Sequence, residues 1–201
     1  MSELLRVFER YEIVRQLTSG GMGDIFLARQ VGVAGFERLV VLKSLRPELV
    51  EDDAQLAQFL NEARVVAQLN HPNIVAVLEV DEYRGVYFIA MEYIAGIDLG
   101  ALLRGAHHAR QRVPFRVSAG VVLDAARGLA HAHQATDREG RPQPLVHRDV
   151  SPQNVMIRVD GIAKVLDFGI ATVAGHLPEG GRVQGKLRYM SPEQQIGRAH
   201  V

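Results

Sequence analysis

A glycine-rich stretch at residues 18–23 constrains the fold of this chain more than any other feature. Residues 11–17 alternate between apolar and polar side chains before it, and residues 25–28 form an apolar run after it. Glycine accepts the positive φ angles that tight turns need. Two strand-like stretches that flank a glycine-rich turn predict a β-hairpin. A further apolar run at residues 39–42 ends at Lys43 and predicts a buried strand.

Two longer stretches have the spacing of amphipathic helices. In residues 54–69 and 117–133, apolar side chains recur every three to four positions, which predicts helices. His-Pro-Asn at residues 71–73 is a stop signal for the first of them. A β-rich part with one helix is therefore followed by a helical part, which is an α+β arrangement. Further strands are predicted at 74–80, 86–91, 155–159 and 163–166.

The composition excludes several classes of protein. Apolar residues make up 47% of the 201 residues, which is enough for a packed core. Lys+Arg and Asp+Glu both number 23, so the basic excess of a nucleic-acid binder is missing. The lack of cysteine excludes disulfides and thiolate metal sites. The sequence contains no apolar run of about 18 residues, so no membrane-spanning helix is predicted. We therefore expect a cytoplasmic chain without nucleic-acid or membrane contact, while anchoring through a further C-terminal region stays open.

Several polar and glycine-containing motifs could carry chemistry, although each has a plainer explanation when taken alone. A glycine cluster is most often only a tight turn. Lys43 at a strand end and Glu62 on a helix would ordinarily be solvated charges. The tripeptides at residues 147–149 and 167–169 could be ordinary polar turns. Only their combination favours a functional interpretation.

Taken in order, these residues match the requirements of γ-phosphoryl transfer. The reaction needs a backbone cradle and a cation for the phosphates, oxygen ligands for Mg²⁺, and an acceptor for the hydroxyl proton. Gly20 and Gly23 flank a turn whose N–H groups could face phosphates. Lys43 is the cation, and Glu62 could hold it in place. The remaining roles fall to Asp149 as proton acceptor and to Asn154 and Asp167 as oxygen ligands for Mg²⁺.

The order of these motifs resembles that of the protein kinase family. The family set is G-x-G-x-x-G-x-V, V-A-I-K, H-R-D-x-x-x-x-N, D-F-G and A-P-E. The resemblance extends over residues 11–195 and points to a bacterial serine/threonine kinase. The corresponding stretches here are TSGGMGDI at 18–25, VVLK at 40–43, HRD at 147–149 with Asn154, DFG at 167–169 and SPE at 191–193.

The resemblance implies a bilobal, kinase-like fold. An N-terminal extension at 1–10 would precede an ATP-binding N-lobe at 11–95. Residues 96–195 would form a partial C-lobe with the catalytic loop, the DFG motif and the activation segment. We expect this lobe to be truncated, because the family needs more chain after Glu193 than the eight residues that follow it. Residues 196–201 could be a non-native tail, since a common sequencing adapter can encode them; the alternative is the native start of the next helix.

The resemblance also implies ATP and Mg²⁺ as cofactors and a protein as substrate. Its implied catalytic residues are Lys43, Glu62 and Asp149, with Asn154 and Asp167 on the metal. A stacked apolar column would consist of Val66, Leu78, His147 and Phe168. The implied nucleotide-binding residues are Leu17, Gly20, Gly21, Gly23, Ile25, Val41, Lys43, Glu92, Ile94, Asp98 and Met156.

Two positions depart from the family pattern in a related way. Serine/threonine kinases usually carry Lys two residues after the catalytic Asp, where this chain has Ser151. They usually carry Thr near the end of the activation segment, where this chain has Lys186. We expect Lys186 to restore the missing cation and therefore count it among the catalytic residues. Otherwise Lys186 is a solvated loop charge and the enzyme is weak or inactive.

Two other functions remain open. The chain could be a nucleotide-binding pseudokinase scaffold that signals by shape, or an inactive fragment. The intact Asp149, Asn154 and Asp167 argue against the scaffold. Serine or threonine is favoured over tyrosine as acceptor, because the arginine that tyrosine kinases carry after the catalytic Asp is missing.

Overall fold

The computed structural model describes residues 10–20, 23–136, 139–168, 172–173 and 187–189, without the side chains of Glu62, Val65, Thr172, Val173 and Leu187. The chain divides into two compact units. Unit 1 consists of Met1–Ala67 and Ala76–Tyr93, and unit 2 of Gln68–Val75 and Ile94–Val201. The predicted lobe boundary at Ala95 lies close to the junction between Tyr93 and Ile94.

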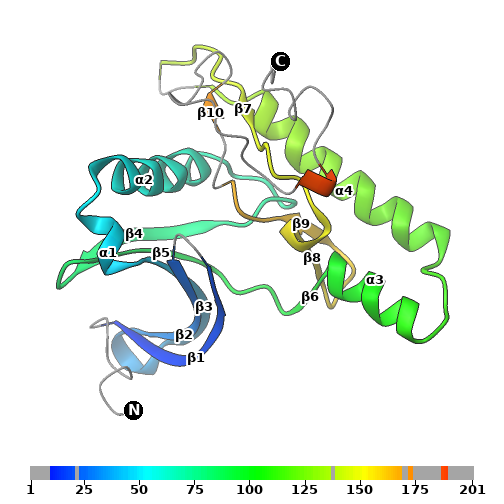
Figure 1. Ribbon diagram of the computed structural model, residues 1–201, viewed down its shortest axis with the longest axis horizontal. Coiled ribbons are helices and arrows are strands. Elements are labelled where there is room, and N and C mark those ends of the chain that lie inside the picture. The colour runs from blue at the N-terminus through cyan, green and yellow to red at the C-terminus, as the bar shows by residue number, and fades with distance from the viewer. Residues whose placement is uncertain (1–9, 21–22, 137–138, 169–171, 174–186, 190–201) are drawn as a thin grey trace. The chain divides into compact units, whose positions relative to one another are not determined.

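Unit 1 is built on a five-stranded antiparallel sheet with the strand order β1-β2-β3-β5-β4 (Figure 1). The glycine-rich turn joins β1 to β2, so the predicted hairpin is confirmed. Two helices, α1 (Pro47–Val50) and α2 (Asp53–Ala67), follow β3. A short 3-10 helix, η2 (Val33–Gly35), connects β2 to β3. The strands are β1 (Tyr11–Ser19), β2 (Gly23–Val31), β3 (Glu37–Leu45), β4 (Val77–Tyr83) and β5 (Val86–Glu92).

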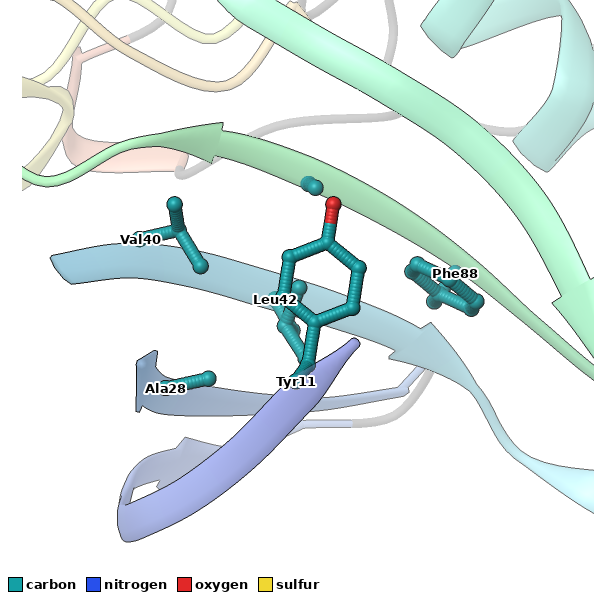
Figure 2. Close-up of a cluster of buried hydrophobic side chains, with 6 residues drawn as sticks. Tyr11, Ala28, Val40, Leu42 and Phe88 are labelled. Atoms are coloured by element: carbon teal, nitrogen blue, oxygen red, sulfur yellow. The ribbon is translucent and has the colours of Figure 1, made fainter. Parts of the chain in front are cut away.

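The two faces of this sheet pack against different partners. Side chains alternate along a strand, so Val40 and Leu42 of β3 point to the face opposite Leu45. Leu45 packs with Phe59 and Ala63 of α2. On the other face, Tyr11 lies across the sheet with its hydroxyl pointing away from β1, as Figure 2 shows. That second cluster consists of Tyr11, Ala28, Val40, Leu42, Phe88 and Ala90.

Unit 2 combines two helices with short strands. The helices are α3 (Leu99–His108) and α4 (Phe115–His133). A three-stranded sheet has the order β6-β8-β9, and its core joins Val121 of α4 to Val155 and Ala163. The other elements are β6 (Gly96–Asp98), β7 (Leu145–Val146), η3 (Pro152–Asn154), β8 (Val155–Arg158), β9 (Ala163–Val165), β10 (Thr172–Val173) and η4 (Leu187–Tyr189).

The predicted α+β class is confirmed, but one strand is displaced and two helices were not predicted. β4 begins at Val77 rather than at 74, because Val75 donates its N–H to Val165 O (2.9 Å) in unit 2. The unpredicted helices are α1, which has only four residues, and α3, whose glycines at 100 and 105 and two terminal histidines weaken its helical signal. Within the described residues, no helix is both long and apolar enough to span a membrane.

Candidate functional site

Strand register gathers three of the predicted nucleotide-binding residues in unit 1. Ile25 of β2 lies opposite Lys43 of β3, and Val41 lies opposite Leu27. Directly opposed residues of antiparallel strands point to the same face. Lys43 and Val41 therefore share their face with Ile25 and with Leu45, which packs on α2. The structure brings Ile25, Val41 and Lys43 together on one face of the sheet.

The glycine-rich turn is closed by its own backbone. Gly20 donates its N–H to the carbonyl of Gly23 (2.9 Å). A Cβ on Gly23 would lie only 1.9 Å from the carbonyl oxygen of Ser44, so glycine is required there by the neighbouring strand. A Cβ on Gly20 would meet nothing closer than 3.7 Å. Leu17 is 38% exposed at the end of β1, whereas Gly21 lies outside the described residues.

Lys43 is half-buried on the sheet face that α2 covers. Glu62 belongs to α2, one residue before Ala63, which packs against this face. The backbone thus carries Glu62 to the same side of the sheet as Lys43. Its side chain lies outside the described part of the chain, so a Lys43–Glu62 ion pair stays a prediction.

The backbone of Glu92 is already partly committed. Its N–H donates to the carbonyl of Ala76 (3.0 Å), and its side chain accepts from the Ala76 N–H (2.8 Å). Ile94, at the start of the second segment of unit 2, is buried.

Asp98 and Met156 are brought together in unit 2. They are direct register partners between β6 and β8. Asp98 also caps α3, since its Oδ1 accepts a hydrogen bond from the Ala101 N–H (2.8 Å). Such a cap satisfies one of the free N–H groups at a helix start. One carboxylate oxygen therefore holds the side chain in place at the end of β6.

The loop before η3 and η3 itself bring the predicted catalytic Asp149 into contact with the predicted metal ligand Asn154. The side-chain amide nitrogen of Asn154 donates to Asp149 Oδ2 (2.9 Å) and to the Asp149 carbonyl (2.8 Å). Because an amide donates from nitrogen and accepts at oxygen, Asn154 Oδ1 remains the atom suited to a cation. Ser151, the residue that precedes η3, is 3% exposed.

His147 ties this loop to the segment that carries Asp167. Its Nε2 donates to the carbonyl of Leu166 (2.8 Å), while its Nδ1 accepts from the Asp149 N–H (3.2 Å). The bond accepted at Nδ1 requires a neutral ring, because a protonated imidazole carries hydrogen on both nitrogens. Burial lowers the pKa of His147, which favours that state. The ring also packs on Phe168, with centroids 4.5 Å apart, so this half of the predicted apolar column forms within unit 2.

Backbone strain marks the same place. Arg148 (φ 61°) and Asp167 (φ 56°) adopt left-handed conformations, which are uncommon for residues other than glycine. Such residues cluster at functional sites, where the surrounding structure holds them. The Leu166 N–H donates to the Asn154 carbonyl (2.8 Å) and so fixes the two strained segments side by side.

The sequence interpretation missed one residue that supports this arrangement. Asp124 of α4 accepts a hydrogen bond from the Ala163 N–H at Oδ2 (3.0 Å). That bond holds the start of β9, the strand that leads to Asp167. A lone carboxylate within the apolar pattern of residues 117–133 was the available signal. Lys186, predicted as catalytic, lies outside the described residues.

The comparisons with known proteins agree with this arrangement. The model of the family described as protein kinase domain matches residues 11–200. A tyrosine-protein kinase, MasK of Myxococcus xanthus, is 46% identical over 97% of this chain and 30% of its own length. The serine/threonine-protein kinase PrkC of Bacillus subtilis is 33% identical over 96% of this chain and 28% of its own.

A solved structure is also similar. The kinase domain of PknI from Mycobacterium tuberculosis has a TM-score of 0.61 at 32% identity, covering 84% of this chain and 63% of that one. The bilobal, kinase-like fold and the resemblance to bacterial serine/threonine kinases are thereby confirmed. The chain spans about a third or less of the length of the curated relatives named here.

Proposed function

Because the chain belongs to the protein kinase domain family, we propose that it transfers the γ-phosphoryl group of ATP to serine or threonine hydroxyls of protein substrates. The observation that carries the proposal is the hydrogen bond from Asn154 to Asp149 beside the strained Asp167. This bond places the Asp149 carboxylate, which can accept a proton, next to oxygen ligands suited to Mg²⁺.

The residues of unit 2 fit these cofactors. ATP supplies the transferred group and Mg²⁺ offsets its negative charge. Asp149 would accept the proton of the attacking hydroxyl, and the Asn154 amide keeps that carboxylate in one orientation. Asn154 Oδ1 and the Asp167 carboxylate would hold the metal, because hard oxygen ligands are the type Mg²⁺ selects.

Unit 1 would contribute the nucleotide-binding residues. Lys43 would bind phosphate oxygens, with Glu62 fixing its position. Ile25 and Val41 offer an apolar surface for the base on the same sheet face. The full proposed set is Leu17, Gly20, Gly21, Gly23, Ile25, Val41, Lys43 and Glu92 from unit 1, with Ile94, Asp98 and Met156 from unit 2.

Ser151 and Lys186 bear on the rate of transfer. Ser151 is buried and neutral, so it cannot place a cation on the transferred group. We propose that Lys186 supplies this charge. Lys186→Ala should lower the transfer rate about 10²-fold or more, the effect expected for a lost charge on the transition state. Introducing a lysine by Ser151→Lys in that variant should recover activity. An unchanged transfer rate in Lys186→Ala would refute the proposed role of Lys186.

Tyrosine is a second candidate acceptor. The 46% identity to a protein named as a tyrosine kinase favours it, as does the missing lysine at 151. PrkC, named as a serine/threonine kinase, favours the first candidate. Phosphoamino-acid analysis of a phosphorylated mixed peptide library separates the two: phosphoserine or phosphothreonine supports our proposal, and phosphotyrosine alone overturns it.

The scaffold and the inactive fragment can be tested on the same chain. ATP with Mg²⁺ should raise its melting temperature if it is a folded nucleotide binder. Asp149→Asn should keep that shift but abolish phosphoryl transfer. If the unchanged chain and Asp149→Asn both show the rise in melting temperature but neither transfers phosphate, the chain is a scaffold. If the unchanged chain shows neither the rise nor transfer, it is an inactive fragment.

We also propose a cytoplasmic location, since the reaction consumes ATP. Protein substrates are the expected partners. The equal numbers of basic and acidic residues argue against nucleic acid as a partner.

A further inference from the structure

Two histidines that have no role in the predicted site stack on each other in unit 2. His71 lies in the segment Gln68–Val75, and His131 lies near the end of α4. Their ring centroids are 4.9 Å apart, with 28° between the ring planes. Nothing in the proposed reaction uses either ring.

The segment Gln68–Val75 is held by hydrogen bonds centred on Asn73, which is 5% exposed. The Asn73 side chain donates to the Ala163 carbonyl (2.8 Å), and its own carbonyl accepts from the Val165 N–H (2.8 Å). Gly128 of α4 lies so close that a Cβ there would be 2.7 Å from the Asn73 carbonyl oxygen. The segment is thus docked on both β9 and α4.

His71 supports the conformation of Asn73 within this segment only as a neutral ring. Its Nδ1 accepts a hydrogen bond from the Asn73 N–H (3.1 Å). A protonated imidazole carries hydrogen on both nitrogens and cannot accept. Protonation would therefore leave the Asn73 N–H without this acceptor in a buried position, which is costly.

The surrounding charges also oppose a proton on His71. His131 and Arg127 face it from α4, and Lys164 faces it from β9. Asp124 of α4 is the one group among these that favours the charged ring. Burial is the largest cause of the lowered pKa of His71, and His131 is the next.

We propose that His71 and His131 form a proton-sensitive clamp, in which protonation of His71 releases the segment Gln68–Val75 from α4 and β9. A folded state that disfavours the proton loses stability as the pH falls below the ordinary histidine value of about 6.5. The segment follows directly on α2, the helix of Glu62. Any effect of its release on nucleotide binding rests on the proposed function, whereas the release itself does not.

The test uses the whole chain, labelled with ¹⁵N and free of nucleotide, so its outcome is independent of the kinase proposal. Amide exchange of Asn73 and Val75, corrected for the intrinsic rate, is measured at about pH 7.5 and about pH 5.5, on either side of the ordinary histidine pKa. We expect protection to fall at the lower pH by up to about 10-fold, which is the largest change that one group with an ordinary pKa of about 6.5 can produce between these two pH values.

Two variants make the result specific. His71→Asn keeps a side-chain acceptor for the N–H two residues on but does not titrate, so its protection should be equal at both pH values. His108→Asn removes an exposed histidine from α3 and should behave like the unchanged chain. Equal losses in His71→Asn and the unchanged chain, or no loss in either, would overturn the proposal.

A direct measurement covers the case in which His71→Asn fails to dock the segment even at the higher pH. Long-range ¹H–¹⁵N spectra of the unchanged chain report which ring nitrogen of His71 carries the proton. We expect the Nε2–H tautomer at neutral pH and loss of the Asn73 protection along the His71 titration. An Nδ1–H tautomer at neutral pH would contradict the proposal, because Nδ1 could then not accept the hydrogen bond from the Asn73 N–H.

Discussion

Tyr11 links the two edge strands of the unit 1 sheet through a single hydrogen bond. β1 and β4 lie at opposite ends of the strand order, yet the Tyr11 hydroxyl donates to the Glu79 carboxylate on β4. Gln30 of β2 donates to the same hydroxyl (3.2 Å). The ring is 2% exposed and packs edge-on against Phe88, with centroids 5.7 Å apart.

Tyr11→Phe removes this hydroxyl and keeps the ring. A hydrogen bond to a charged group contributes about 1.5–3 kcal/mol. Glu79 retains 24% side-chain exposure and a second partner, Arg10, so water and Arg10 can partly replace the lost donor. We therefore expect a loss near the lower end, about 1.5 kcal/mol in the free energy of unfolding.

Urea unfolding of the whole chain measures this loss. Tyr93→Phe is the matched control, because Tyr93 is 38% exposed and should change stability by less than about 0.5 kcal/mol. A double-mutant cycle with Glu79→Ala, which removes the acceptor, isolates the pair, and its coupling should be about 0.5–3 kcal/mol. Additive effects of the two substitutions would refute the reasoning, even if each destabilised the protein.

The pH dependence gives an independent check of the same bond. Burial and the bond to Glu79 raise the pKa of Tyr11 well above its ordinary value of about 10. The folded state thus keeps the proton that the unfolded chain loses. Stability from Tyr11 should be complete below about pH 10 and should decline above it. Tyr11→Phe should lack this decline, and a parallel decline in both proteins would contradict the assignment.

Three further substitutions test other parts of the structure. Gly23→Ala should destabilise unit 1 by about 1–3 kcal/mol in urea unfolding, because the new Cβ meets the Ser44 carbonyl at 1.9 Å. Gly105→Ala, in open space on α3, should instead stabilise the chain by about 0.5–1 kcal/mol. Asn154→Ala should reduce the Mg²⁺-dependent part of the ATP-induced rise in melting temperature, and an unchanged rise would remove Asn154 from the metal site.

Local patterns predicted the elements of this fold better than their ends. The hairpin around the glycine-rich turn follows from alternation and glycine alone, which are local properties. The start of β4 at Val77 does not, because it depends on Val75 bonding to Val165, far along the chain. Long-range pairing of this kind leaves no periodic signal in the residues concerned.

The candidate site divides in the same way. Motif order identified Asp149, Asn154 and Asp167, since their side-chain chemistry is readable from residue type. The orientation of these three side chains could not be predicted from the sequence. The direction of the Asn154 amide depends on its hydrogen bond to Asp149, and the placement of Asp167 depends on the Leu166 bonds to His147 and Asn154.

The glycine-rich turn shows why a motif residue can have more than one reason to be present. Gly23 matches the motif of a phosphate-binding loop, yet the Ser44 carbonyl forbids any Cβ there whether or not a nucleotide binds. Gly20 meets no such barrier. Loss of ATP binding in Gly23→Ala would therefore report damage to the sheet, whereas loss in Gly20→Ala at unchanged stability would report the turn itself. Only the second variant can assign phosphate binding to this loop.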